Sequence, residues 1–458
     1  MKKRDILFTE GPLMKNLLFF SLPILFSGIL QLLYNAADLV VVGQFAQKGA
    51  LASVGTSSSV INLLVNAFTG LSVGACIVTA KYLGARDRHK ASAAAHTSIV
   101  ISLITGTMVL IVGISAAGLI LKKMNTPDEI FDRALLYMRI YFAGAPALTV
   151  YNFGAAIMRA MGDTRYPLKI LSVSGIINVL LNLFFVIVLK LDVAGVALAT
   201  IISQVFSAVM IILHLCKTPS PVRISFKKLK IDFQELKSII KIGLPAGIQG
   251  SVFSLSNIVI QSSINLFGSV AMDGCAAAGN VEGFIYTAMN SVSQASMTFT
   301  SQNYGAKNYK RISQVFYKCG LLVSIMGIGL SGIAILLREP ILSIYLKSSD
   351  AIGFAVERLI INVSLYFICG LMESFSGSIR GMGYSILPMT VSLLGACGVR
   401  LLWVFTVFQW HQSLPVLFAS YPISWTVTTL THFICFVIIK NKVIKSANNT
   451  CNIAQNAV

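Results

Sequence analysis

One aspartate, Asp38, lies inside the apolar run LLYNAADLVVVGQF at residues 32–45. A carboxylate in an oily setting is costly unless it is paired, hydrated or protonated. Tyr34 and Asn35 precede it by four and three residues, so on a helix the three side chains share one face. The alternatives are a carboxylate that binds H⁺ or Na⁺ and a hydrogen-bonded acid with a structural role. Because acids inside membranes mark functional sites, we expect the ion-binding role.

Two asparagines in the stretch NVLLN, Asn178 and Asn182, could assist this acid. They are four residues apart and therefore lie on the same face of a helix. An amide donates a hydrogen bond to a carboxylate but does not itself titrate. The two residues either support Asp38 or simply join helices by hydrogen bonds.

The second half of the chain has three charged residues within apolar stretches: Glu282, Glu373 and Arg400. Each acid could contact a cationic ligand or an ion. Arg400 could instead hold one of the two acids in an ion pair. The sequence contains no distances that choose between these alternatives.

Other chemistry is not indicated by the sequence. The eight cysteines are scattered without a CxxC pair, and the five histidines lack ligand spacing. We therefore expect no metal site and no cofactor. A Walker A motif (GxxxxGK[ST]) is also missing, which argues against ATP as the energy source.

The composition is that of a membrane protein. Of 458 residues, 55% are hydrophobic and only 12% are charged, against about 25% charged in soluble domains. The mean hydropathy is +0.78. The start, MKKRDILFTEGPLMK, is polar, and the apolar run after it is too long for the core of a signal peptide. We expect that run to be the first membrane helix.

Breaks at charge, proline and glycine clusters divide the chain into twelve apolar segments, which predict an all-α polytopic fold with twelve transmembrane helices. A helix needs about 20 residues to cross the hydrocarbon core. The segments lie near 15–43, 51–80, 91–121, 130–156, 166–189, 193–216, 238–267, 272–301, 312–337, 351–379, 386–409 and 413–439.

Basic residues alternate strongly between the two sides of these segments. Twenty-six of the 36 Lys and Arg residues fall on one side, six on the other, and four within spans. The positive-inside rule therefore predicts a multi-pass protein of the cell membrane with both termini in the cytoplasm. The net charge of +19 reflects this topology, so we expect no nucleic-acid partner.

The two halves of the chain are internal repeats. RAMGDTRYP at 159–167 recurs as RGMGYSILP at 380–388, and KYLGAR at 81–86 recurs as QNYGAK at 302–307, both with an offset of 221. Six spans per copy predict two lobes related by a pseudo-two-fold axis along the membrane normal. The expected parts are an N-terminal lobe (1–216), a cytoplasmic basic linker (217–237), a C-terminal lobe (238–441) and a short cytoplasmic tail (442–458).

Two prolines stand at matching places near the start of the first and seventh spans. Pro23 in SLP answers Pro245 in GLP, with an offset of 222. Proline removes a backbone donor and kinks a helix. The pair is either a set of hinges or a set of fixed kinks.

Together these motifs resemble the multidrug and toxic compound extrusion (MATE) family. The resemblance rests on the two prolines, on YLGAR and NYGAK, and on YNFGAAIMRAMGDTRYP at 151–167 with its counterpart RGMGYS. It extends over residues 10–440. It implies a transporter rather than an enzyme: a monomeric secondary antiporter that exports small amphipathic or cationic compounds against an inward H⁺ or Na⁺ gradient.

This sequence departs from the family pattern at two acids. One branch has an aspartate where Asn182 stands, and another has an acid on the seventh span, which here reads GLPAGIQGSVFSLSN without charge. The coupling ion, H⁺ or Na⁺, therefore stays open. An alternative function is flipping of a lipid-linked saccharide, as in related folds, but such flippases have cavities with many basic residues.

Overall fold

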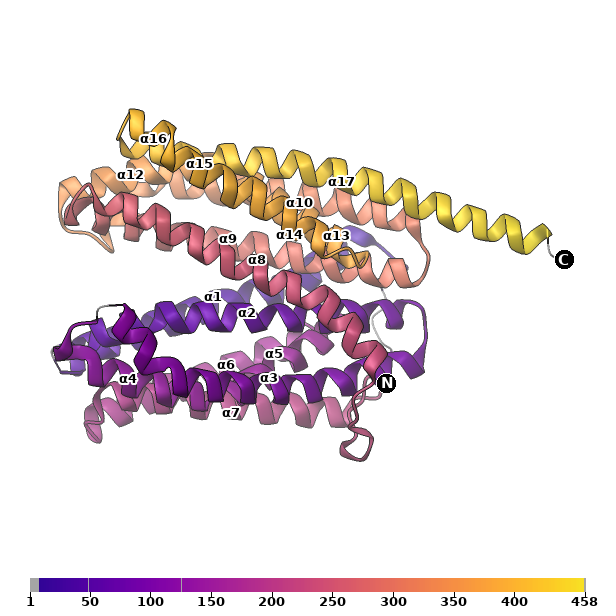
Figure 1. Cartoon of the computed structure of the whole chain (residues 1–458), viewed down its shortest axis with the longest axis horizontal. Helices are drawn as coiled ribbons and strands as arrows, with labels where there is room; N and C mark the ends of the chain where they lie inside the picture. Colours follow the sequence, from indigo (N-terminus) through magenta and orange to yellow (C-terminus); the bar gives the residue numbers. More distant parts are fainter. Residues whose placement is uncertain (1–7, 48, 125, 457–458) are drawn as a thin grey trace. The chain divides into compact units, whose positions relative to one another are not determined.

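A computed structural model of the chain describes residues 8–47, 49–124 and 126–456, which form helices and no strands (Figure 1). Lys2, Lys3, Arg4 and Lys48, which contributed to the predicted topology, lie outside the described residues. The α-helices are α1 (Leu13–Phe45), α2 (Ala50–Gly84), α3 (Arg88–Lys123), α4 (Asp128–Ala143), α5 (Ala145–Ala160), α6 (Arg165–Leu183), α7 (Asp192–Lys217), α8 (Phe233–Asn265), α9 (Ser269–Gly305), α10 (Tyr309–Leu336), α11 (Arg338–Ser343), α12 (Ser349–Ser364), α13 (Tyr366–Gly381), α14 (Ile386–Ser392), α15 (Val399–Phe405), α16 (Val407–Trp410) and α17 (Leu414–Asn456). Two π-helical turns, η1 (Phe184–Val188) and η3 (Leu393–Gly398), and one 3₁₀ turn, η2 (Phe226–Lys228), complete them.

The predicted apolar segments are all helical. By length and composition, eight helices of the described chain could span a membrane, or ten spans if each of two bent pairs counts as one. The predicted second span, α2, contains a shorter apolar stretch, Phe68–Gly84. The predicted eighth span, α9, is 37 residues long and buries many serines and threonines, because it packs against α10, α12 and α13.

The internal repeat of the sequence is also visible in the backbone conformation of the two halves. Arg86 and Lys307, which end KYLGAR and QNYGAK, both have a left-handed φ of 57°. The next residues, Asp87 and Asn308, both cap the following helix with their side chains. Each motif therefore stops one helix and starts the next in the same way.

The fourth and tenth predicted spans also share their breaks. The α4–α5 pair and the α12–α13 pair are each bent by 46°, and the breaks fall at Gly144 and Leu365, 221 residues apart. Gly162 and Gly383, which follow these spans, both have φ of +90°, a conformation that glycine adopts without strain.

The described residues form two compact units. The N-terminal unit is Leu22–Ser251, and the C-terminal unit is Phe8–Ser21 together with 252–456. This division differs from the predicted lobes, because the start of α1 packs with the C-terminal unit and the start of α8 packs with the N-terminal unit. Each unit has its own apolar core, around Phe142 in the first and Leu359 in the second.

Glycines explain why the start of α8 belongs to the N-terminal unit. Gly70 and Gly74 on α2 face Gly243 and Gly247 on α8, so two GxxxG patterns meet. A Cβ built on Gly243 would lie 2.6 Å from the Cα of Leu71. The two backbones therefore approach too closely for any larger residue.

The start of the described chain is held by the C-terminal unit. The Phe8 ring stacks on Phe299 of α9 at 3.8 Å between centroids, and the Phe8 amide donates to Gln302 Oε1 at 2.8 Å. Arg311 of α10 donates to the carbonyl oxygens of Phe8 and Glu10 at 2.9 and 2.8 Å. These contacts place residues 8–21 with the C-terminal unit.

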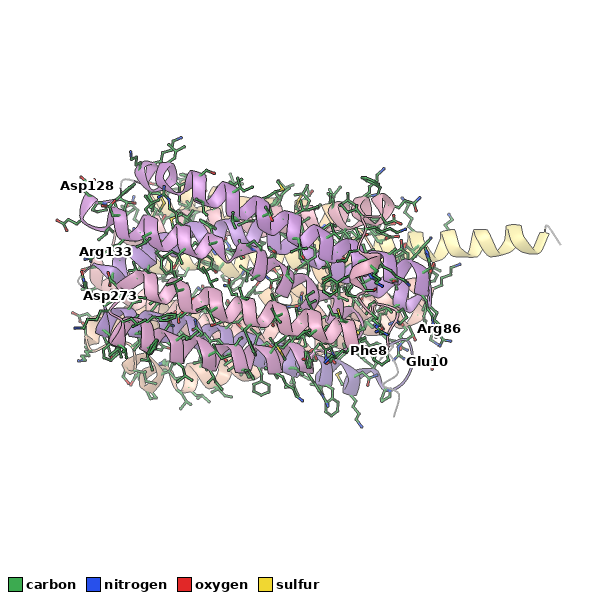
Figure 2. All side chains as sticks on the ribbon, turned by 90° about the horizontal axis from the view of Figure 1, so that it is seen from below. Phe8, Glu10, Arg86, Asp128, Arg133 and Asp273 are labelled. Carbon is green, nitrogen blue, oxygen red and sulfur yellow. The ribbon has the colours of Figure 1, made fainter. Side chains whose placement is uncertain are left out.

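The ends of each unit carry the loop charges. Figure 2 shows Arg86 at one end of the N-terminal unit and Asp128 and Arg133 at the other. At that second end, Arg133 pairs with Asp192 at 3.5 Å, so Arg133 lies near a helix end and not within the apolar part of a span. In the C-terminal unit, Phe8 and Glu10 lie at the end opposite Asp273.

Candidate functional site

The N-terminal unit positions Asp38 by a tight contact between α1 and α6. A Cβ on Gly175 of α6 would overlap the ring of Tyr34, so the tyrosine lies directly on the glycine backbone. The Tyr34 hydroxyl donates to the carbonyl oxygen of Leu171 at 3.1 Å. Tyr34 therefore fixes α1 against α6 one turn before Asp38.

Asp38 meets Asn182 at this helix contact. The Asn182 amide donates to Asp38 Oδ1 and also, at 3.4 Å, to Asn178 Oδ1. Asn178 donates to Thr200 Oγ1 of α7 at 3.5 Å, and Thr200 donates to the carbonyl oxygen of Val196 at 3.0 Å. Each donor in this hydrogen-bond network points toward an acceptor, and Asp38 is the one ionisable member of the network.

Two oxygens of the network have no hydrogen-bond donor among the described residues. One is Asp38 Oδ2, and the other is Oδ1 of the fully buried Asn182. The hydroxyl groups of Tyr137 and Tyr141 on α4 lie within electrostatic range of Asp38. The arrangement offers a proton or a small cation the carboxylate of Asp38.

The other predicted members of this site are placed less closely. Asn35 makes no hydrogen bond to a described residue, although it shares a helix face with Asp38. Pro23 lies inside α1, two residues after Ser21, the last residue of this helix that belongs to the C-terminal unit. Pro245 lies inside α8. Whether either proline is a hinge stays a prediction.

The C-terminal unit pairs Glu282 with an arginine that the sequence analysis did not select. Arg358 of α12 donates Nε and an Nη to the two carboxylate oxygens of Glu282 at 3.0 and 2.9 Å. Asn362, one turn later, donates to Glu282 Oε1 at 3.0 Å. The side chains of the ion pair are only 12% and 9% exposed.

Glu373 and Arg400 are not joined to each other by a hydrogen bond or an ion pair. Glu373 and Arg380 lie two turns apart on α13 and interact electrostatically. Arg400 follows the π-helical turn η3 and donates Nε to Ser424 Oγ at 3.0 Å. The sequence therefore located the charges of this unit, but not their partners.

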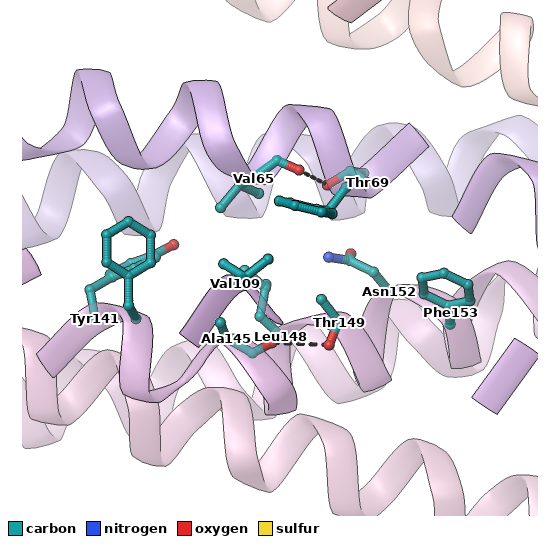
Figure 3. A pocket seen from close by; sticks show the side chains of 11 residues that line it. Val65, Thr69, Val109, Tyr141, Ala145, Leu148, Thr149, Asn152 and Phe153 are labelled. Carbon is teal, nitrogen blue, oxygen red and sulfur yellow. Dashed lines mark hydrogen bonds between the residues drawn. The ribbon is translucent and has the colours of Figure 1, made fainter. Parts of the chain in front are cut away.

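A pocket in the N-terminal unit contains the repeat counterpart of Glu373. Asn152, 221 residues earlier, extends its amide into this pocket, while Thr69 and Thr149 turn their hydroxyls back to backbone carbonyls (Figure 3). The pocket surrounds the break between α4 and α5. It is lined by Val65, Phe68, Thr69, Val109, Tyr141, Phe142, Ala145, Leu148, Thr149, Asn152 and Phe153.

Replacing Gly175 by alanine is expected to displace Tyr34 and lower the stability of the chain by about 1–3 kcal/mol, the usual cost of overpacking. Thermal unfolding of the detergent-solubilised protein measures this loss of stability. Gly55→Ala is the matched control, because a Cβ there meets no atom within 4 Å. The double variant Gly175→Ala/Tyr34→Ala should recover part of the loss. Unchanged unfolding of Gly175→Ala would contradict the contact.

Sequence reasoning missed two residues, Thr200 and Arg358. Thr200 carries no charge and lies in an ordinary apolar span, so no sequence signal marks it. Arg358 had a signal, since a charge within a span requires a partner. The contacts of both residues become visible only when the helices are packed together.

Comparison with known proteins agrees with the fold and the repeat. The family model MatE matches twice, over residues 23–184 and 245–406, with the offset of 222 that separates Pro23 from Pro245. Similar proteins include the "Probable multidrug resistance protein YoeA" of Bacillus subtilis, 26% identical over 91% of this chain and 92% of that protein. The "Probable multidrug resistance protein NorM" of Thermotoga maritima is 23% identical over 87% and 86%.

Solved structures give the same architecture. One, described as the outward-facing conformation of a multidrug resistance MATE family transporter of the MOP superfamily, has a TM-score of 0.91 over 97% of this chain and 100% of that one, at 20% identity. That likeness confirms the predicted fold of twelve helices in two lobes. The resemblance seen in the sequence motifs is confirmed. Because the family model covers more than half of the residues, in two copies, the chain belongs to the MatE family.

Proposed function

We propose that the chain is a secondary active antiporter of the cell membrane that exports small amphipathic or cationic compounds in exchange for H⁺ or Na⁺. The observation that carries this proposal is the contact of Asp38 with Asn182, inside a network in which two oxygens have no donor among the described residues. A proton or sodium ion bound there would neutralise Asp38 and alter the contact between α1 and α6. Ion binding would thereby bias the conformation of the N-terminal lobe.

The substrate class is supported by the names of the relatives. Two are probable multidrug resistance proteins, and the "Multidrug export protein MepA" of Staphylococcus aureus is 23% identical over 58% of this chain. Glu373 is our candidate contact for a cationic substrate, because its carboxylate makes no hydrogen bond to a described residue. For Glu282 we favour the ion-pair role, because Arg358 occupies both of its oxygens.

Transport would proceed by alternating access, in which the two lobes open to one side of the membrane and then to the other. Pro23 and Pro245 are the candidate hinges, since they lie in the two helices that contribute to both compact units. We place both termini in the cytoplasm and expect a monomer. A lipid-linked saccharide flippase is favoured less, because such flippases have cavities with many basic residues, and here Glu282 neutralises Arg358.

The test uses the purified full chain in liposomes with independently imposed pH and sodium gradients. Movement of a fluorescent cation such as ethidium should accelerate several-fold under one of the two gradients and return to the basal rate when an ionophore collapses it. The ion whose gradient drives transport is the coupling ion. An equal rate with and without both gradients would contradict antiport.

A further inference from the structure

Arg400 occupies an unusual position in the C-terminal unit. Arg400 is only 3% exposed, yet among the described residues its side chain makes a single hydrogen bond, from Nε to the Ser424 hydroxyl. The guanidinium Cζ lies 4.3 Å from the ring centroid of Tyr421 and 5.8 Å from that of Trp425. These partners all come from α17, so one helix supplies an aromatic platform beneath the cation.

No acid of the described chain is paired with this cation. Glu282 is held by Arg358 and Asn362, and Glu373 interacts with Arg380. Arg400 is therefore a buried cation without a paired acid among the described residues.

A buried guanidinium without a counter-ion is costly, and a serine hydroxyl with an aromatic face offsets only part of that cost. The Tyr421 ring lies on one side of the guanidinium. The two Nη atoms make no hydrogen bond to a described residue. A planar edge with two parallel donors is the geometry that binds a carboxylate with two hydrogen bonds.

The local backbone is also unusual. Arg400 comes two residues after η3, a π-helical turn, and such turns occur often at functional sites. In the N-terminal unit, η1 begins two residues after Asn182, in the equivalent fifth span. Each unit therefore has a π-helical turn two residues away from a polar side chain of interest, which is Asn182 in the N-terminal unit and Arg400 in the C-terminal unit.

We propose that Arg400 is a binding site for the carboxylate of an amphipathic ligand. The proposal rests on the proposed function and narrows its substrate class. The transporter would accept compounds that carry an acid group as well as a cation, and Arg400 would distinguish them from purely cationic ones.

Rhodamine 19 and rhodamine 6G test this, because the second is the ethyl ester of the first and lacks only the free carboxylate. Binding of each dye to the full chain in neutral detergent is measured by fluorescence polarisation. Arg400→Gln should weaken binding of rhodamine 19 by about ten- to a hundred-fold, the usual effect of losing hydrogen bonds to a charged group. Binding of rhodamine 6G should change by less than about threefold. Arg400→Lys should retain part of the rhodamine 19 affinity.

Lys347→Gln is the control, because it removes one exposed positive charge from the same unit. Retained binding of rhodamine 6G shows that a variant is folded. Equal weakening of both dyes by Arg400→Gln, or no binding of rhodamine 19 to the unaltered chain, overturns the carboxylate site. Binding does not depend on ion gradients. A chain that binds both dyes with the expected contrast but moves neither in liposomes refutes the antiport proposal and leaves the Arg400 site standing.

Discussion

Asp38→Asn is expected to reduce ion-driven transport to the level of empty liposomes while the chain still folds and inserts. Asparagine has nearly the same shape, and its carbonyl oxygen accepts the hydrogen bond that Asn182 donates to Asp38. It binds neither a proton nor a charge-balancing cation in the physiological pH range. The network would therefore persist without the one group that titrates.

The measurement is dye movement in liposomes under imposed pH and sodium gradients. Asp128→Asn is the matched control, since it makes the same chemical change at the exposed first turn of α4. Its loss of one helix-end charge should cost at most about 1 kcal/mol of stability and no transport. Asp38→Glu, which keeps a carboxylate, should retain part of the activity. Gradient-driven export by well-folded Asp38→Asn would assign Asp38 a structural role only.

The fold could be predicted from the sequence because its signals are local or repeated. Apolar length predicts spans wherever lipid must be crossed. The offset of 221 relates KYLGAR to QNYGAK, and the same offset relates the αL residues Arg86 and Lys307. The family model repeats over the two halves in the same way.

The packing of α1 and α8 could not be predicted in the same way. Hydropathy describes a whole helix, but these helices begin in one unit and continue in the other. The glycine pairs that hold α8, at Gly70 and Gly243, are visible as GxxxG patterns once they are sought. Which two patterns meet is decided by tertiary packing alone.

The candidate site was partly foreseeable. Asp38 and Asn182 stand out as polar residues in apolar spans, and the structure brings them together. Thr200 does not stand out from the apolar residues around it in this way. The roles of these residues in ion coupling stay predictions until the Asp38 variants are measured.

Breaking the Glu282–Arg358 pair should have the largest effect on stability. Glu282→Gln leaves a buried guanidinium without its carboxylate, and Arg358→Gln leaves a buried carboxylate with only the Asn362 amide. Removal of one partner of a buried pair typically costs about 3–5 kcal/mol, whereas neutral replacement of both is often tolerated. The double variant Glu282→Gln/Arg358→Gln should therefore be more stable than either single variant.

Thermal unfolding of the four proteins in detergent forms a double-mutant cycle that isolates the coupling energy. The ion pair of Arg133 and Asp192, at 3.5 Å and with an arginine side chain 32% exposed, is the internal control. Its disruption by Asp192→Asn should cost at most about 1 kcal/mol, because solvent screens it. Additive effects at Glu282 and Arg358 would show that the two charges act separately. Glu282 would then regain the alternative role that the pair now argues against, contact with a cationic substrate, alongside Glu373.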